Sequence, residues 1–143
     1  MRLIAGATAG LVALAAVATL AGRWVDIVEV RGRSMAPSLL PGELLVVERW
    51  TYRRRRPRRG DVVLVRDPRS PRRELVKRVA ATDGVRLELH GDAPEASTDS
   101  RMFGELPVAA VRWRVALRYW PPGRIGSVQG SGTAAEGGDR LDA

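Results

Sequence analysis

The chain has 143 residues, enough for one small domain, and carries a formal net charge of +8. It contains no cysteine, which excludes disulfide bonds, thiol catalysis and cysteine-based metal sites, and its single histidine makes a histidine-rich metal site implausible. We therefore expect neither a metal nor a cofactor. The excess of arginine is compatible with binding to nucleic acid or to anionic lipid.

The chain begins with an apolar run, because residues 3–22 are twenty consecutive residues without a charge. At about 1.5 Å rise per residue, a helix of this length spans about 30 Å, the thickness of a bilayer core. Trp24 suits an aromatic anchor at the interface. We expect a transmembrane anchor over residues 1–24. A cleaved secretory signal is the alternative, because Arg2 precedes the run and Ala16-Val17-Ala18 has a small-x-small form.

Short runs with β character follow, separated by turn-forming proline, glycine and aspartate residues. They cover residues 25–31, 43–49, 61–66, 74–81, 85–90 and 111–119. This spacing predicts an all-β barrel or sandwich in a domain of residues 25–120. Residues 121–143 are rich in glycine, serine, alanine and proline without apolar periodicity, which predicts a disordered tail.

A basic loop is predicted at residues 49–59, which hold seven arginines together with Trp50 and Tyr52. Such a loop could lie on anionic lipid headgroups if the chain is tethered. It could equally be a solvated loop in a chain biased toward arginine.

The only lysine, Lys77, lies in a predicted strand. The two-residue period of a strand places it on one face with Leu75 and Val79. If that face is inward, desolvation lowers the lysine pKa, as a lysine general base requires, whereas arginine does not deprotonate in proteins. An exposed cation at a strand edge is the alternative.

Ser34 is a candidate nucleophile, because it lies between a predicted strand and Pro37, where the chain leaves a sheet and turns. A serine hydroxyl needs a base to attack at neutral pH. Lys77 is the better candidate than His90, because Asp92 stands next to His90 on a turn and could not easily orient its ring from behind. Residues 91–104 gather further polar groups, for which a satisfied polar turn is the alternative.

Four segments in order resemble the conserved boxes of type I signal peptidases. The nucleophile box, Ser-Met-x-Pro, resembles GRSMAPSLLPGE, and the Arg-Gly-Asp-Val-Val box resembles RRGDVVLVRDP. The lysine box resembles LVKRVAATDG, and the Gly-Asp-Asn box resembles GDAPEASTDSRMFG, with Ala93 in place of asparagine. The resemblance covers about residues 25–120 and implies an all-β Ser-Lys protease.

The resemblance implies a role for each matching residue. Ser34 would be the nucleophile and Lys77 its neutral general base. Ser97 would orient the lysine, and Asp99 and Arg101 would form a supporting ion pair.

The resemblance also implies that the backbone N–H of Ser34 supplies part of an oxyanion hole. Gly32 stands where some family members have a serine donor, so this position has no side chain to contribute. Met35 and Pro37, in the same box, would contact substrate.

The predicted function is therefore a membrane-tethered serine endopeptidase that removes signal or leader peptides after small residues, of the Ala-x-Ala type. Its partners would be leader peptides and the bilayer, and no nucleic acid is expected. The short length and the LRYWPP ending also resemble the maturation proteases of nickel-type superoxide dismutase. In another class, a non-catalytic basic protein that binds membrane or nucleic acid would explain the arginine loop but not the four boxes.

The orientation in the membrane has two conflicting indications. The family resemblance implies a single-pass protein whose catalytic domain lies outside the cytoplasm. Arg23, Arg31 and Arg33, however, outnumber Arg2 and the amino terminus, and the positive-inside rule then favours the reverse. We follow the family in expecting an extracytoplasmic catalytic domain.

Overall fold

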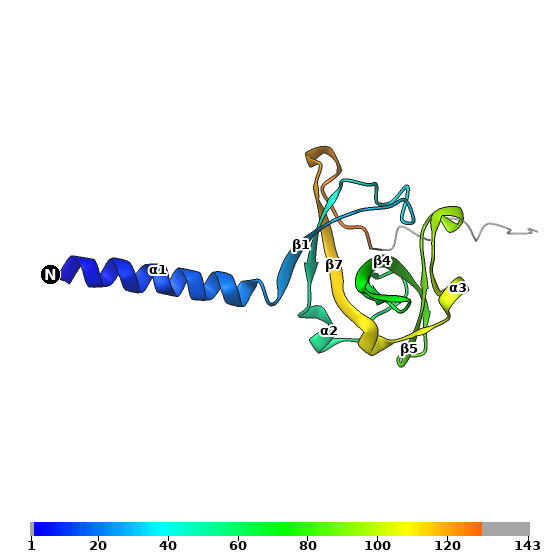
Figure 1. Ribbon diagram of the computed structural model, residues 1–143, viewed down its shortest axis with the longest axis horizontal. Helices are drawn as coiled ribbons and strands as arrows, with labels where there is room; N and C mark the ends of the chain where they lie inside the picture. The colour runs from blue at the N-terminus through cyan, green and yellow to red at the C-terminus, as the bar shows by residue number, and fades with distance from the viewer. Residues whose placement is uncertain (1, 130–143) are drawn as a thin grey trace, which may run out of the picture.

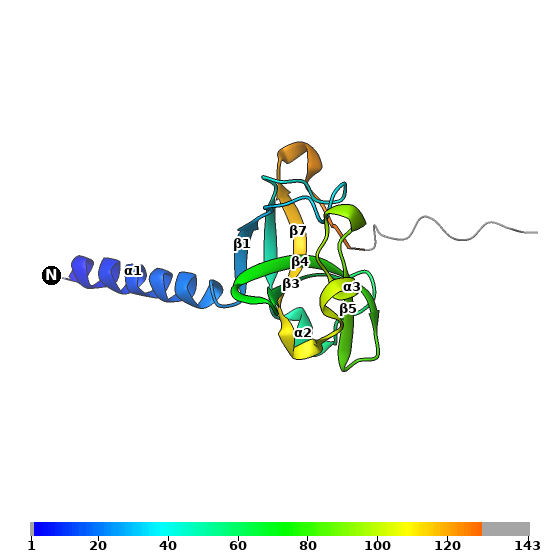
Figure 2. The same cartoon turned by 45° about the vertical axis from the view of Figure 1, so that its right-hand side comes forward.

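The structure is a computed structural model that describes residues 2–129, with residues 2–9 described by their backbone alone. It begins with helix α1, Arg2–Ala21, which extends away from the β domain in both views (Figures 1 and 2). Within the described residues, no helix is long and apolar enough to cross a membrane. The side chains of residues 1–9 lie outside that description, and the transmembrane span over residues 1–24 stays a prediction.

One antiparallel sheet forms the domain, in the strand order β1-β2-β7-β3-β4-β5-β6, which confirms the predicted all-β class. The strands are β1 Val25–Glu29, β2 Leu44–Glu48, β3 Val62–Asp67, β4 Ser70–Thr82, β5 Arg86–His90, β6 Leu106–Pro107 and β7 Val111–Trp120. The helices α2 Thr51–Arg54 and α3 Ser100–Phe103 are short, as are the 3-10 turns Pro94–Ala96, Val108–Ala110 and Pro122–Arg124.

All six predicted runs form strands, but strand β6, the short helices α2 and α3 and the 3-10 turns were not predicted from the pattern. Strand β6 has only two residues, too few to show a period, and pairs with β5 through Leu106 and Leu87. Helix α2 lies inside the predicted arginine loop and has no buried residue that an apolar period could reveal.

The core has two apolar clusters, and strand β3 contributes to both. Val62 belongs to the first cluster, while Val63 and Val65 belong to the second. The first also holds Val30, Met35, Leu39, Leu45, Val47, Val115 and Val128, and the second holds Leu75, Val79, Leu87, Leu89 and Leu106. The loop that carries Ser34 therefore rests on the first cluster, and the strand that carries Lys77 rests on the second.

The predicted disordered tail begins too early. Gly126 forms a bridge with Arg118, and Val128 is buried in the first cluster. The Gln129 side chain accepts a hydrogen bond from the Val62 backbone at 2.7 Å and donates one to the Val115 carbonyl, which ties the segment to β3 and β7. The domain therefore extends to residue 129, and residues 130–143 of the predicted tail lie outside the described residues.

Candidate active site

Ser34 lies in the loop after β1 and is half-buried. Met35 and Leu39, on the same loop, are buried in the first cluster, and the Leu39 N–H donates to the Met35 carbonyl at 2.8 Å. Gly32 has a φ of +144°, which favours glycine. The Ser34 carbonyl accepts a hydrogen bond from Ala93 at 2.9 Å. The loop is thus held by the packing of its apolar side chains in the first cluster and by the hydrogen bond from the segment after β5.

Ser34 and Lys77 line the same cavity, which has a volume of about 400 Å³. The wall comes from the end of β1, from the first half of β4 and from the segment after β5. Its apolar side chains include Val28, Val30, Leu75 and Ala96. Two residues that are 43 positions apart in the sequence therefore meet at one concave surface.

Lys77 is only 2% exposed, so the face of β4 that it shares with Leu75 and Val79 is inward, and the alternative of an exposed cation at a strand edge is wrong. Its Nζ donates to the Ser97 Oγ at 2.9 Å. Desolvation by burial lowers the pKa of Lys77 to about 8, against the opposing charge of Asp99 and with a smaller contribution from Arg73. About a tenth of this amine is therefore neutral at pH 7, far more than for a lysine with its ordinary pKa.

A hydrogen-bond chain continues from the lysine to Asp99, which is fully buried. Ser97 donates to the Asp99 Oδ2 at 2.6 Å, and Arg101 forms the expected ion pair with Asp99 at 2.5 Å. Burial alone would raise the pKa of Asp99, but hydrogen bonds from Arg101, Ser97 and the Gly91 N–H outweigh it and hold that pKa well below its usual range. The charged carboxylate thus fixes the orientation of Ser97.

Gly91 is a residue whose importance the sequence reasoning missed. A Cβ at this position would overlap both the Ser97 Oγ and the Ser34 carbonyl, so a side chain cannot be accommodated without movement of the site. The available signal was a glycine directly after a strand, which often marks a close approach of backbone or ligand. Gly91 allows the nucleophile loop and the lysine-orienting serine to pack together.

Two residues considered from the sequence lie away from the cavity wall. His90 pairs with Glu88, with 2.8 Å between Nε2 and Oε1, and does not line the cavity that contains Ser34. Pro37 is exposed and also lies outside the wall, where its carbonyl accepts a hydrogen bond from Arg124. Met35 does line the cavity, although only 2% of it is exposed.

An all-β domain with a serine and a desolvated lysine on one cavity has the groups that a Ser-Lys hydrolase needs. Residues 3–93 match the family described as signal peptidase, peptidase S26. The chain belongs to this peptidase family, as the four boxes indicated. The matched region contains Ser34 and Lys77 and ends before Ser97.

Curated relatives support the same assignment. The chain is 34% identical over 128 residues to mitochondrial ATP-independent inner membrane protease subunit 1a of Arabidopsis thaliana, covering 73% of this chain and 76% of the relative. It is 31% identical over 135 residues to mitochondrial inner membrane protease subunit 2 of Danio rerio, covering 79% and 74%. It is 26% identical over 125 residues to subunit 1 of the Homo sapiens protease, covering 73% and 75%.

Proposed function

We propose that this protein is a membrane-tethered serine endopeptidase that removes signal or leader peptides, with Ser34 as nucleophile and Lys77 as general base. The observation that carries the proposal is the burial of Lys77, with its lowered pKa of about 8, at the cavity that Ser34 lines. Membership of a signal peptidase family supports the class of reaction.

In the proposed mechanism, neutral Lys77 accepts the hydroxyl proton of Ser34 as the Ser34 Oγ attacks the scissile carbonyl. The lysinium then gives this proton to the departing amine, which leaves an ester on Ser34. A water molecule, deprotonated by Lys77, hydrolyses the ester and restores both residues. Ser97 accepts a hydrogen bond from the lysine Nζ and holds its lone pair in position.

The backbone N–H of Ser34 is the proposed donor to the oxyanion. Its own carbonyl is bonded to Ala93, and no hydrogen bond from the Ser34 N–H to another described residue is found. Gly32 has no side chain that could donate to the oxyanion. Its positive φ instead allows the turn that the loop makes before Ser34.

The substrate is proposed to bind as an extended strand. In the described residues β1 pairs only with β2, and the first half of β4, residues 70–77, pairs only with β3. Both unpaired edges reach the cavity, and backbone addition to such edges is a common mode of peptide recognition. Small side chains before the cut, as in Ala-x-Ala, are proposed from the family resemblance, and the apolar residues of the wall, such as Val28 and Leu75, are compatible with them.

The membrane tether is proposed from the uncharged residues 3–22 and from relatives that are themselves named inner membrane proteases. Helix α1 would place the active site near one membrane surface, where a membrane-held leader is at high effective concentration. The catalytic domain is proposed to lie on the extracytoplasmic side.

The decisive test uses the full chain and a peptide with an Ala-x-Ala leader, with products identified by mass spectrometry. We expect Ser34→Ala and Lys77→Ala to abolish cleavage, while His90→Ala cleaves at close to the wild-type rate. Circular dichroism serves as the control for folding. A folded, fully active Lys77→Ala protein together with an inactive His90→Ala protein would show that the Ser-Lys assignment is wrong.

A further inference from the structure

A second cavity, of about 550 Å³, lies where α1 joins the β domain. Four arginines and two tryptophans line it, from the end of α1, from the β2–α2 segment and from β7. They are Arg23, Arg49, Arg53, Arg112, Trp24 and Trp113, and we call this site the arginine cavity. All four arginines are exposed.

Two of these arginines are held by stacking on the tryptophans. The Arg53 guanidinium lies 4.7 Å from the centre of the Trp24 ring, and the Arg49 guanidinium lies 5.0 Å from that of Trp113. A guanidinium stacked on an aromatic ring keeps its N–H groups free at its edge, in the geometry that binds phosphate oxygens. The cavity therefore presents oriented donors.

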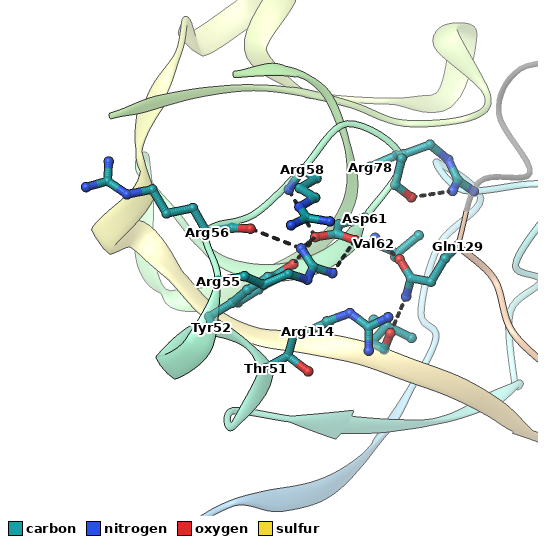
Figure 3. Close-up of polar contacts among 12 residues, drawn as sticks. Thr51, Tyr52, Arg55, Arg56, Arg58, Asp61, Val62, Arg78, Arg114 and Gln129 are labelled. Carbon is teal, nitrogen blue, oxygen red and sulfur yellow. Dashed lines mark hydrogen bonds and ion pairs between the residues drawn. The ribbon is translucent and has the colours of Figure 1, made fainter. Parts of the chain in front are cut away.

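Neighbouring arginines are engaged within the protein, and Figure 3 shows one of these contacts, that of Arg55 with Asp61. Arg55 pairs with Asp61 at 2.7 Å, Arg56 donates to the Gly84 carbonyl and Arg114 pairs with Glu48 at 3.3 Å. The contacts of Arg55 and Arg56 attach the predicted arginine loop to the residue before β3 and to the β4–β5 turn, and Asp61 neutralises part of the charge of the loop.

The arginine cavity differs, because within residues 2–129 no carboxylate forms an ion pair with any of its four arginines. Four positive charges around one concavity repel one another and produce a strong local positive potential. A bound anion would relieve this repulsion.

We propose that the arginine cavity binds the phosphate headgroup of an anionic phospholipid. The cavity begins at Gly22, directly after α1, and leucines along that helix are exposed, including Leu11, Leu14 and Leu20. Lipid acyl chains would surround this apolar helix. The lipid headgroups would then lie at the C-terminal end of α1, beside the β domain (Figure 1). Trp24 and Trp113 suit the same interfacial depth. The inference rests on the proposed tether and not on the Ser-Lys chemistry.

The test reconstitutes the full chain into phosphatidylcholine vesicles that contain spin-labelled phosphatidylglycerol or spin-labelled phosphatidylcholine. The motionally restricted fraction of each label measures its relative association with the protein. We expect a preference for phosphatidylglycerol that weakens with salt and that inorganic phosphate at equal concentration does not abolish. Competition by inorganic phosphate as strong as that by phosphatidylglycerol would instead show a site for free anions and overturn the lipid assignment.

A matched pair of variants separates the cavity from general surface charge. Arg49→Gln with Arg53→Gln should lower the relative affinity for phosphatidylglycerol by roughly tenfold. Arg54→Gln with Arg59→Gln removes the same charge from exposed positions of the same loop that do not line the cavity, and should leave the preference nearly unchanged. Equal losses in both variants, or no loss in either, would overturn the proposal.

The failure of this site is distinguishable from failure of the peptidase. The Arg49 and Arg53 double variant should cleave a short soluble leader peptide at the wild-type rate, which also shows that it is folded. Ser34→Ala should lose cleavage and keep the lipid preference. A chain that does not enter vesicles would overturn both the tether and the lipid site, whatever its activity.

Discussion

Lys77 and the arginine cavity show two opposite uses of positive charge in one small domain. Lys77 is 2% exposed and its pKa is lowered to about 8 by burial, whereas the four cavity arginines are exposed and two of them, Arg49 and Arg53, stack on tryptophan. Lysine can lose its proton under such desolvation, and guanidinium groups stay protonated in proteins. In the proposed function the single lysine therefore stands where the charge has to be lost, and in the proposed lipid site arginine stands where it has to be kept.

Exchanging the residue types at the buried site is expected to have the largest effect. Lys77→Arg keeps the charge but supplies no base, so kcat/KM for an Ala-x-Ala leader peptide should fall by at least about 10³-fold. Circular dichroism and a thermal melt check that the variant is folded. An active Lys77→Arg enzyme would mean that the position supplies charge alone, and the proposed base would have to be abandoned.

Removing the buried charge should stabilise the fold below the lowered pKa. Between pH about 8 and 10.5 the native lysine is neutral while the unfolded one binds a proton, so wild-type stability rises with pH across this window. Lys77→Met lacks this dependence. Its advantage in free energy of unfolding should therefore be larger by about 3 kcal/mol below pH 8 than above 10.5.

Urea unfolding of both proteins at a series of pH values measures this difference. Lys77→Ala, which leaves a cavity, is the control that separates loss of charge from loss of packing. A Lys77→Met advantage that does not change with pH would contradict desolvation as the cause of the lowered pKa.

The pH dependence of kcat/KM also reports on the environment of Lys77. Only neutral Lys77 takes the Ser34 proton, so kcat/KM should rise about tenfold per pH unit and reach a plateau, with a midpoint near pH 8. The negative charge of Asp99 opposes the lowering, so Asp99→Asn should move the midpoint to lower pH in whatever activity remains. A midpoint near 10.5, or no pH dependence, would contradict the assignment of Lys77 as the base.

Much of the lysine site could be predicted from the sequence, because the burial of Lys77 follows from the residues next to it in its strand. The two-residue period placed Lys77 on one face with Leu75 and Val79, and the structure shows that this face is inward. The association of Ser34 with Lys77 came instead from the choice among the few candidate bases and from the order of the four boxes, since no local pattern reports a contact across 43 positions. The same boxes supplied the Asp99 and Arg101 ion pair, which is present in the structure.

The rest depends on tertiary contacts that leave no periodic signal. The overlap that a Cβ at Gly91 would make with the Ser34 carbonyl exists only in the folded chain. Val128 lies in a segment rich in glycine, serine and proline without apolar periodicity, so composition suggested disorder where the fold buries it. The arginine loop looked uniform in sequence, but the fold divides it into paired arginines, such as Arg55, and stacked ones, such as Arg53.

The smallest expected effect is the contribution of the cavity arginines to the free energy of unfolding. Arg53→Gln loses one stacking contact, which contributes about 0.5–1 kcal/mol at exposed sites, and it also removes one of four mutually repelling charges. These effects oppose each other, so the free energy of unfolding should change by less than about 1 kcal/mol. Raising the salt concentration screens the repulsion in the wild type, and the variant should then be slightly the less stable of the two. Urea unfolding in detergent micelles at low and high salt measures this difference, with Arg54→Gln as the matched exposed control. A loss well above about 1 kcal/mol would show that the cavity arginines hold the domain together, and the contrast between a charge lost at Lys77 and a charge kept for a bound anion would not stand.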